Sequence, residues 1–378
     1  MQQLSQEELV RYARHLAIPE FGREAQLKLK AAKVLVIGAG GLGSPVLLYL
    51  AAAGVGHIGI VDFDRVDRTN LQRQVLYTEQ DVGQPKAATA KAKIQALNPH
   101  INISVYDEAF TSDNALELIR QYDVVADGTD NFPTRYLVND ACVLSGKVNV
   151  YASIFRFEGQ VSVFNYLLED GSRGPNYRDI FPAPPPPGLV PSCAEGGVLG
   201  VLPGIVGSLQ ASEVIKVITG VGEPLVGRLF LFDAAAFSTR VLKFKKNPKT
   251  TITQLIDYDE FCGIVPAEEV DTSVKSITVR QLQQWIAEKR DFQLIDVREP
   301  YEYDIAHLNG ELIPLEQLSA SISKIAKDRP VVLHCRSGKR SAKAIQQLQA
   351  QQPFDHLLNL KGGILAWIDQ IDRGMTRY

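Results

Sequence analysis

The sequence contains little cysteine, tryptophan or methionine: four cysteines, two tryptophans and two methionines occur in 378 residues. Four widely spaced cysteines are too few for a disulfide scaffold in a chain of this length, so we expect free thiols in a reducing cytosol. The amino terminus has no basic stretch followed by an apolar run. We therefore expect no secretory signal and a cytoplasmic protein.

An excess of positive charge is also missing. The formal net charge is −3 and the sequence pI is about 6.1, which argues against a role in binding nucleic acid or anionic membranes. The most apolar stretch, residues 34–61, is broken by glycines and a proline and does not suit a membrane span. Hydrophobic residues make up 45% of the chain and its length suggests about two or three globular domains.

The first two thirds of the chain alternate apolar strands with helices. This order is typical of a doubly wound, Rossmann-like α/β sheet. After residue 151 the pattern changes to strands without obvious crossovers, then to a proline-rich irregular segment at 174–193. The predicted strands are 33–37, 57–62, 101–106, 123–127, 159–165 and 228–233, and the predicted helices are 45–53, 86–97, 114–122 and 203–219.

The last hundred residues restart the alternation, which predicts a second, smaller α/β domain. We expect residues 1–263 to form the first domain, 264–271 a linker and 272–378 the second domain. The second domain is predicted to contain helices at 279–289 and 340–349 and strands at 293–296, 331–335 and 357–360.

A glycine-rich turn follows the first strand. Gly38, Gly40 and Gly43 match the G-x-G-x-x-G pattern, in which backbone amides approach phosphate at a helix N-terminus. Asp62 and Asp64 follow at the end of the next strand, where an acidic residue suits a ribose hydroxyl. A simple tight turn would not account for that acidic strand end, so the pattern predicts a nucleotide site.

Later residues favour a triphosphate over a dinucleotide. Arg73 and Lys86 are cations suited to phosphates, and Asp130 is a carboxylate suited to Mg²⁺. Each has an ordinary structural explanation as well, namely a salt-bridge arginine, a solvated lysine and a helix cap. Their occurrence together indicates a site for attack on an α-phosphate.

With these residues in view, the chain resembles the HesA/MoeB/ThiF family, the bacterial relatives of ubiquitin-activating enzymes, over about residues 1–263. The match is of the MoeB type. The strings that support it are Arg11-Tyr-Ala-Arg14, Gly38–Gly43, Asp62-Phe-Asp64, Asn70-Leu-Gln-Arg-Gln74, Gly83-Gln-Pro-Lys86, Asp127-Gly-Thr-Asp-Asn131, Glu158-Gly-Gln160 and Gly207-Ser-Leu-Gln210.

The resemblance implies ATP and Mg²⁺ as cofactors and a homodimer, in which Arg14 reaches the ATP of the other subunit. It implies that Asp62 contacts the ribose, that Asn70 faces the phosphates with Arg73 and Lys86, and that Asp130 holds Mg²⁺. The full set of implied ATP contacts is Gly38, Gly40, Gly41, Gly43, Asp62, Asp64, Asn70, Leu71, Gln72, Arg73, Lys86, Asp130 and Asn131.

The implied reaction joins the C-terminal glycine carboxylate of a small ubiquitin-like carrier, ending in Gly-Gly, to AMP and releases pyrophosphate. That carboxylate is already ionised at neutral pH and needs no general base. Positioning and charge neutralisation must therefore carry the catalysis.

The cysteines depart from the family pattern, because most MoeB-like proteins carry two C-x-x-C pairs that bind structural zinc. The matching positions here are Asn176, Asp179, Asp259 and Cys262, a poor ligand set for zinc, so we expect no zinc. Cys193 follows the proline-rich segment, at the position of the family's crossover-loop cysteine. The resemblance implies a thioester or acyl disulfide there; the alternative is a loop thiol without a catalytic role.

A second candidate site is the segment Cys335-Arg-Ser-Gly-Lys-Arg340, which ends an apolar strand and opens a helix. Backbone amides and cations there favour a thiolate and bind an anion. Four residues separate Cys335 from Arg340, fewer than phosphate-cleaving loops need, so the cradle suits sulfur. The persulfide loop consists of Arg336, Ser337, Gly338, Lys339 and Arg340.

Residues 272–378 resemble a rhodanese, supported also by Asp296-Val-Arg-Glu-Pro300, His307-Leu-Asn-Gly310 and Gly362-Gly-Ile-Leu-Ala-Trp367. The resemblance implies a persulfide on Cys335. We expect Asp296 and Arg298 to have a structural role, holding the strand that leads to the loop.

Together the two resemblances predict an adenylyltransferase and sulfurtransferase that turns the carrier's C-terminal glycine into a thiocarboxylate. A MoaD-type carrier in molybdopterin synthesis is expected, with a ThiS-type carrier for thiamine as the second candidate. The sulfur donor is expected to be a persulfide protein or thiosulfate. Two rival functions are a carrier-binding scaffold without activity and an NAD-dependent oxidoreductase with a regulatory rhodanese domain.

Overall fold

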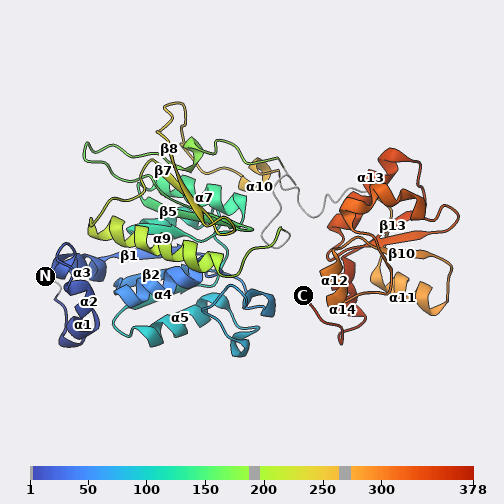
Figure 1. Ribbon diagram of the computed structural model, residues 1–378, viewed down its shortest axis with the longest axis horizontal. Helices are drawn as coiled ribbons and strands as arrows, with labels where there is room; N and C mark the ends of the chain where they lie inside the picture. Colours follow the sequence, from blue (N-terminus) through green and yellow to red (C-terminus); the bar gives the residue numbers. More distant parts are fainter. Residues whose placement is uncertain (1–2, 187–195, 264–273) are drawn as a thin grey trace. The chain divides into compact units, whose positions relative to one another are not determined.

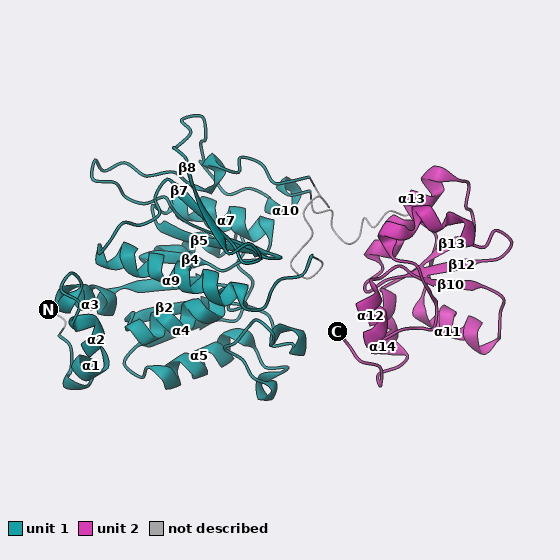
Figure 2. Ribbon diagram, viewed as in Figure 1, with its two compact units in different colours: residues 1–264 teal, residues 265–378 magenta. Residues whose placement is uncertain are grey.

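The computed structural model describes residues 3–186, 196–263 and 274–378 (Figure 1). It divides into two compact units, Met1–Ile264 and Val265–Tyr378, each with its own β-sheet (Figure 2). The predicted linker, residues 264–271, lies outside the described residues.

The sheet of the first unit has eight strands in the order β3-β2-β1-β4-β5-β6-β7-β8. Neighbours from β3 to β5 pair in parallel, and those from β5 to β8 pair antiparallel. The parallel half has the order of a doubly wound sheet, which confirms the predicted fold class. The strands are β1 (Lys33–Ile37), β2 (His57–Val61), β3 (Asn102–Tyr106), β4 (Val124–Asp127), β5 (Val148–Phe155), β6 (Glu158–Phe164), β7 (Arg228–Asp233) and β8 (Ser238–Lys243).

Helices cover both faces of the parallel half. Side chains alternate along β1, so Val34 and Val36 join the core under α4, α5 and α9, whereas Leu35 and Ile37 join the core under α6 and α7. The helices of this unit are α1 (Gln6–Arg11), α2 (Ala13–Leu16), α3 (Gly22–Ala31), α4 (Gly43–Ala53), α5 (Lys86–Leu97), α6 (Ala115–Arg120), α7 (Phe132–Leu144), α9 (Leu202–Thr219) and α10 (Tyr258–Phe261).

The turn between β1 and α4 depends on glycine. A Cβ on Gly43 would lie 2.0 Å from the Gly38 carbonyl oxygen, and Gly38 has φ of +90°. Helix α9 approaches α4 closely, because a Cβ on Gly207 would lie 2.5 Å from Cγ of Pro45. The amide of Gln210, also on α9, donates to the carbonyls of Asp127 and Val150 at 2.7 and 2.8 Å. Helix α9 therefore holds β4 and β5 in place at the point where the carboxyl end of β4 borders the site.

The second unit has a five-stranded sheet in the order β11-β10-β12-β13-β9, with all pairs parallel. Apolar cores lie on both faces, as predicted for a smaller α/β domain. Within the described residues, no helix is long and apolar enough to cross a membrane. The elements are β9 (Ser276–Ile277), α11 (Val279–Ala287), β10 (Gln293–Asp296), α12 (Pro300–Ile305), β11 (Glu311–Leu312), β12 (Val331–His334), α13 (Lys339–Gln351), β13 (Leu357–Leu360) and α14 (Gly363–Gln370).

Candidate active sites

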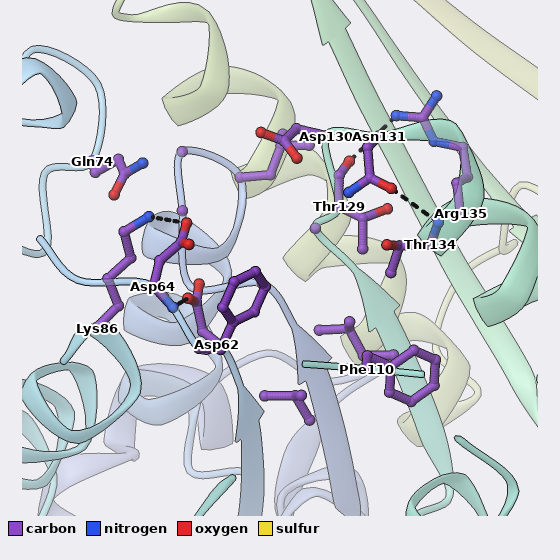
Figure 3. Close-up of a pocket in the computed structure, with 18 of the residues that line it drawn as sticks. Asp62, Asp64, Gln74, Lys86, Phe110, Thr129, Asp130, Asn131, Thr134 and Arg135 are labelled. Carbon is purple, nitrogen blue, oxygen red and sulfur yellow. Dashed lines mark hydrogen bonds and ion pairs between the residues drawn. The ribbon is translucent and has the colours of Figure 1, made fainter. Parts of the chain in front are cut away.

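The first unit has a cavity at the carboxyl ends of β1, β2 and β4, where the order of strands reverses. Ligands bind at this point in doubly wound sheets. Figure 3 shows Asp62, Asp64 and Lys86 grouped on one side of it and Thr129, Asn131 and Arg135 on the other. The predicted residues that line the cavity are Gly38, Gly40, Gly41, Asp62, Asp64, Arg73, Lys86, Asp130 and Asn131.

Asp62, just after β2, holds the glycine-rich turn. Its Oδ2 accepts the Ala39 amide at 2.8 Å, and its Oδ1 accepts the Asp64 amide at 2.8 Å. Burial raises the pKa of this carboxyl, against the opposing charge of Lys86. Each carboxylate oxygen has a second acceptor site, so Asp62 can shape the turn and still accept ribose hydroxyls.

Lys86 begins α5 with its side chain only 6% exposed. Its Nζ lies 2.9 Å from Oδ2 of Asp64, an ion pair visible in Figure 3. The buried hydroxyl of Tyr77 donates to the Ala39 carbonyl at 2.8 Å and lies 3.3 Å from the Lys86 carbonyl, which ties the start of α5 to the glycine-rich turn. A cation is thus held beside the turn that would cradle phosphate.

Only part of the segment Asn70–Gln74 lines the cavity. Asn70, the last residue of a short 3-10 helix, accepts the backbone amide of the N-cap residue Asp67 at 3.3 Å, and it does not line the cavity; nor do Leu71 and Gln72. Arg73 lines the cavity and donates to the Thr69 carbonyl at 3.0 Å. Gln74, which was not predicted to face the nucleotide, is buried there, and its Oε1 has no partner in the described part of the chain.

The end of β4 builds the opposite wall. Oδ1 of fully buried Asp127 accepts the Thr129 amide at 3.0 Å and the Thr129 hydroxyl at 2.6 Å. Burial raises the pKa of Asp127 to about 6. Oδ1 of Asn131 accepts the Thr134 amide at 3.0 Å and so caps α7. The exposed carboxylate of Asp130 has no hydrogen bond within the described residues and lines the cavity.

Arg135 is a second cavity residue that the sequence did not reveal. It is 9% exposed, lines the cavity and donates to the Thr129 carbonyl at 3.3 Å. Its guanidinium carbon lies 5.4 Å from the ring centroids of both Phe132 and Tyr151. The only sequence signal is an arginine in an otherwise apolar part of α7, which by itself does not point to a ligand.

Other predicted residues lie elsewhere. Arg14 is exposed on α2 and does not line the cavity. Gly43 is the first residue of α4 and does not line the cavity. Cys193, the candidate acceptor of the carrier, lies outside the described residues. Cys142, on α7, is fully buried in the core between this helix and the sheet.

Of the four positions that correspond to the family's zinc ligands, Asn176 and Asp179 belong to a polar cluster, whereas Asp259 is exposed on α10. Asn176 is buried and its Oδ1 accepts the Arg178 amide at 2.9 Å, while Asp179 accepts the Asn176 amide at 2.7 Å. Arg178 pairs with the buried Asp140, at 2.7 Å. Burial raises the pKa of the Cys262 thiol to about 11. No group of three or more potential metal-binding side chains occurs among the described residues.

In the second unit, Cys335 follows β12 and is buried, 1% exposed. Its Sγ accepts the Gly338 amide at 3.1 Å and lies 3.4 Å from the Ser341 hydroxyl. The N-terminus of α14 supports this loop, because the Ile364 amide donates to the Cys335 carbonyl at 2.9 Å. A Cβ on Gly363 would lie 2.4 Å from that carbonyl oxygen.

Two cations of the loop already have partners. Arg340 forms a bidentate ion pair with Glu302, and Arg336 donates twice to the Tyr378 carbonyl, at 2.9 and 2.7 Å. Ser337 and Lys339 are exposed, and Lys339 has no ion pair within the described residues.

Asp296 and Arg298 are both buried and hydrogen-bonded to each other, from Nε at 2.8 and 3.0 Å. Arg298 also donates to the Ala306 carbonyl at 2.8 Å. These contacts tie the end of β10 to α12. That the pair holds the strand that leads to the Cys335 loop stays a prediction.

Residues 12–253 match the sequence pattern of the ThiF family, and residues 278–370 match that of the rhodanese-like domain. The chain belongs to the ThiF family. It is 51% identical, over 99% of its length and 96% of the relative, to the probable adenylyltransferase/sulfurtransferase MoeZ of Mycobacterium tuberculosis. It is 40% identical, over 99% of its length and 89% of the relative, to the adenylyltransferase and sulfurtransferase MOCS3 of Bos taurus.

The ThiF unit by itself has relatives too. A sulfur carrier protein adenylyltransferase of Thermus thermophilus is 54% identical over 69% of this chain and 98% of its own. A crystal structure of E. coli MccB has the same fold, with a TM-score of 0.57 and 23% identity over 67% of this chain and 74% of that chain. The predicted class, a ThiF-type adenylyltransferase joined to a rhodanese sulfurtransferase, is confirmed.

Proposed function

We propose that this protein uses ATP to adenylate the C-terminal glycine of a small ubiquitin-like sulfur carrier and then replaces the AMP with sulfur from Cys335. The observation that carries the proposal is the convergence of the glycine-rich turn, Asp62, Arg73 and Lys86 on one cavity. The same chain holds a buried thiol at a helix N-terminus. The relatives named as sulfur carrier protein adenylyltransferase and as adenylyltransferase/sulfurtransferase support it.

The residues of the cavity suit attack by a carboxylate on an α-phosphate. Lys86 is buried beside Asp64, which keeps its ammonium in place until triphosphate competes for it. Arg73 lies on the same wall, and the two cations would offset the charge that develops on pyrophosphate as it leaves. Asp62 would accept ribose hydroxyls and fix the nucleotide against the turn.

Asp130 would hold Mg²⁺. Its carboxylate is exposed to the cavity and lacks a hydrogen bond within the described residues, and oxygen donors are the ligands that Mg²⁺ takes. Carboxylate and phosphate oxygens together make a chemically suitable set. The bound ion would supply positive charge to the phosphates.

The sulfur step would begin with a persulfide on Cys335, whose terminal sulfur displaces AMP from the adenylate and forms an acyl disulfide. The Cys193 thiolate would then attack Sγ of Cys335, releasing the carrier thiocarboxylate and leaving a Cys193–Cys335 disulfide. A cytosolic thiol must reduce that disulfide before the next turnover. Replacing Cys193 with alanine should make the acyl disulfide accumulate, which intact-protein mass spectrometry detects.

ATP–pyrophosphate exchange by the purified protein, with and without a carrier ending in Gly-Gly, tests the adenylation. Carrier-dependent exchange is the expected result. The carrier is proposed to be of MoaD type, for molybdopterin synthesis, and exchange with only a ThiS-type carrier would assign the protein to thiamine synthesis. Exchange with neither would favour a carrier-binding scaffold.

We infer further that the protein is a cytoplasmic homodimer without structural zinc. The exposure of Arg14 on α2 leaves it available to a second subunit. Asn176 and Asp179 are committed to hydrogen bonds at the zinc positions. Light scattering would detect the dimer, and metal analysis that finds one tightly bound zinc per chain would contradict the zinc inference.

A further inference from the structure

The loop around Cys335 carries three cations in its sequence, but Arg340 is paired with Glu302. Nη1 and Nη2 of Arg340 each lie 2.6 Å from a different oxygen of Glu302. The Glu302 side chain is 3% exposed, so water screens the pair little. Bidentate, charge-assisted contacts of this kind are the strongest hydrogen bonds that arginine makes.

The surroundings of Glu302 hold it in place. Its Oε2 also accepts the Glu299 amide at 3.1 Å, which completes the capping box of α12. Its Oε1 lies 3.3 Å from the Tyr378 hydroxyl. Although burial by itself raises it, the hydrogen bonds and charge of Arg340 keep the pKa of Glu302 below its ordinary value. Glu302 is therefore an anion fixed near the loop.

Arg340 is also close enough to Cys335 for their charges to interact. The hydrogen bonds that Arg340 donates to Glu302 raise the pKa of Arg340, against the effect of burial, and the negative charges of Glu302 and of Cys335 in its thiolate form raise it as well. An anion approaching the sulfur would thus meet Arg340 with its charge already balanced. Arg336 is likewise occupied by the Tyr378 carbonyl, which leaves Lys339 as the exposed cation of the described loop.

We propose that Glu302 is a specificity-determining residue that lowers the affinity of the Cys335 loop for small dianions, thiosulfate in particular. The proposal rests on the proposed function, since it assumes that Cys335 accepts sulfur. In that reaction the thiolate attacks the outer sulfur of thiosulfate, the new S–S bond forms, and the S–SO₃ bond breaks. Sulfite leaves with the electron pair, so no oxidant or reductant is needed.

The test is the KM for thiosulfate of Glu302→Gln in the full-length protein, with cyanide as the sulfur acceptor. Glutamine keeps the capping hydrogen bond to Glu299, because its amide oxygen can accept it. Removing the carboxylate charge frees Arg340 for the dianion, so KM should fall about tenfold. The fall should shrink as ionic strength rises, whereas kcat should change little.

Two further variants make the test specific. Glu311→Gln removes the same charge from an exposed pair with Lys324, 3.9 Å apart, and should leave the KM unchanged. The double variant Glu302→Gln/Arg340→Gln should lose the tenfold gain, because the cation that Glu302 releases is gone. Thermal unfolding of each variant establishes that it is folded.

A fall in KM for Glu302→Gln that persists in the double variant would overturn the proposal, and so would an unchanged KM. The proposed function is judged separately, by whether the wild-type protein forms a Cys335 persulfide and supports carrier-dependent exchange. A wild-type protein that does both, with no effect of Glu302→Gln, would leave the function standing and remove only the role of Glu302.

Discussion

Both candidate sites begin where a buried parallel strand ends in a turn with glycine and a helix starts, but they differ in extent. The first gathers side chains from the ends of β1, β2 and β4 and from the start of α5. The second is centred on one loop, in which the Gly338 amide donates to the sulfur of Cys335 and Arg340 pairs with Glu302 of α12. In the first site several side chains contribute to the reaction, whereas in the second the reaction depends on the sulfur of Cys335.

This difference leads to the largest expected effect. Cys335→Ala should abolish persulfide and thiocarboxylate formation, because no other group replaces the attacking sulfur. ATP–pyrophosphate exchange should remain at the wild-type rate, since every cavity residue is intact. Mass spectrometry of the carrier and the exchange assay measure the two steps on one preparation. Equal loss of both would mean that the two sites are not chemically separate.

In the first site, one substitution should reduce the reaction without abolishing it. Lys86→Met should slow exchange by about 100- to 1000-fold, which is the usual loss when one electrostatic contact to a transition state is removed. Persulfide formation at Cys335 should not change. The matched control is Lys93→Met, which removes a lysine from the same helix that pairs with Asp81 at 2.9 Å and does not line the cavity. Equal losses in both variants would point to general damage to α5.

The two glycine turns allow a direct structural comparison. A Cβ would lie 2.0 Å from a backbone oxygen at Gly43 and 2.4 Å from one at Gly363. Alanine at either position should destabilise its own unit by about 2–4 kcal/mol through strain in the turn. Gly43→Ala should impair exchange and Gly363→Ala persulfide formation.

Gly204→Ala, on α9, is the control for these variants, because among the described residues no atom outside the adjoining backbone of its own helix lies within 4 Å of a Cβ at that position. It should be neutral or slightly stabilising, since alanine favours helix more than glycine does. Hydrogen exchange of each unit measures the effects. A loss of protection in the wrong unit would contradict the assignment of each turn to its own site.

Much of the fold could be predicted because many strands and helices have a recognisable local pattern of apolar and polar residues. Strands β1, β7, β10 and β13 have the predicted bounds, since each is an apolar run closed by polar or turn residues. Strand β8 was missed because every residue in it is exposed, so it has no buried face to produce an alternating pattern. It is the pairing with β7, a tertiary contact, that makes it a strand.

In the candidate sites, too, contiguous motifs could be predicted from the sequence, whereas contacts that depend on folding could not. The Cys335 loop is contiguous and could be recognised whole, but its pairing with Glu302 comes from α12 and is not visible in the motif. Gln74 and Arg135 were missed because only the folded chain places them on the cavity. Asn70 lies in the expected string, but a local capping contact keeps it off the cavity wall.

The smallest expected effect concerns His334, the last residue of the strand that leads to Cys335. His334 is fully buried beside Asp296, 3.6 Å away, and burial lowers the pKa of this histidine to about 4 from 6.5. Between these pH values the unfolded chain binds the proton more readily than the folded chain. The stability associated with neutral His334 is therefore complete above pH 6.5 and is lost as the pH falls toward 4.

The second unit should consequently lose about 2–3 kcal/mol of stability from this group between about pH 7 and pH 4. His334→Leu removes the titration and keeps an apolar side chain in the core, so the denaturation midpoint of that unit should depend less on pH. His307→Leu, which replaces an exposed histidine of the same unit, should keep the wild-type dependence. Because His334 and His307 both belong to the second unit, the first unit should show no change from either variant, and a parallel shift in both units would assign the pH effect to another group.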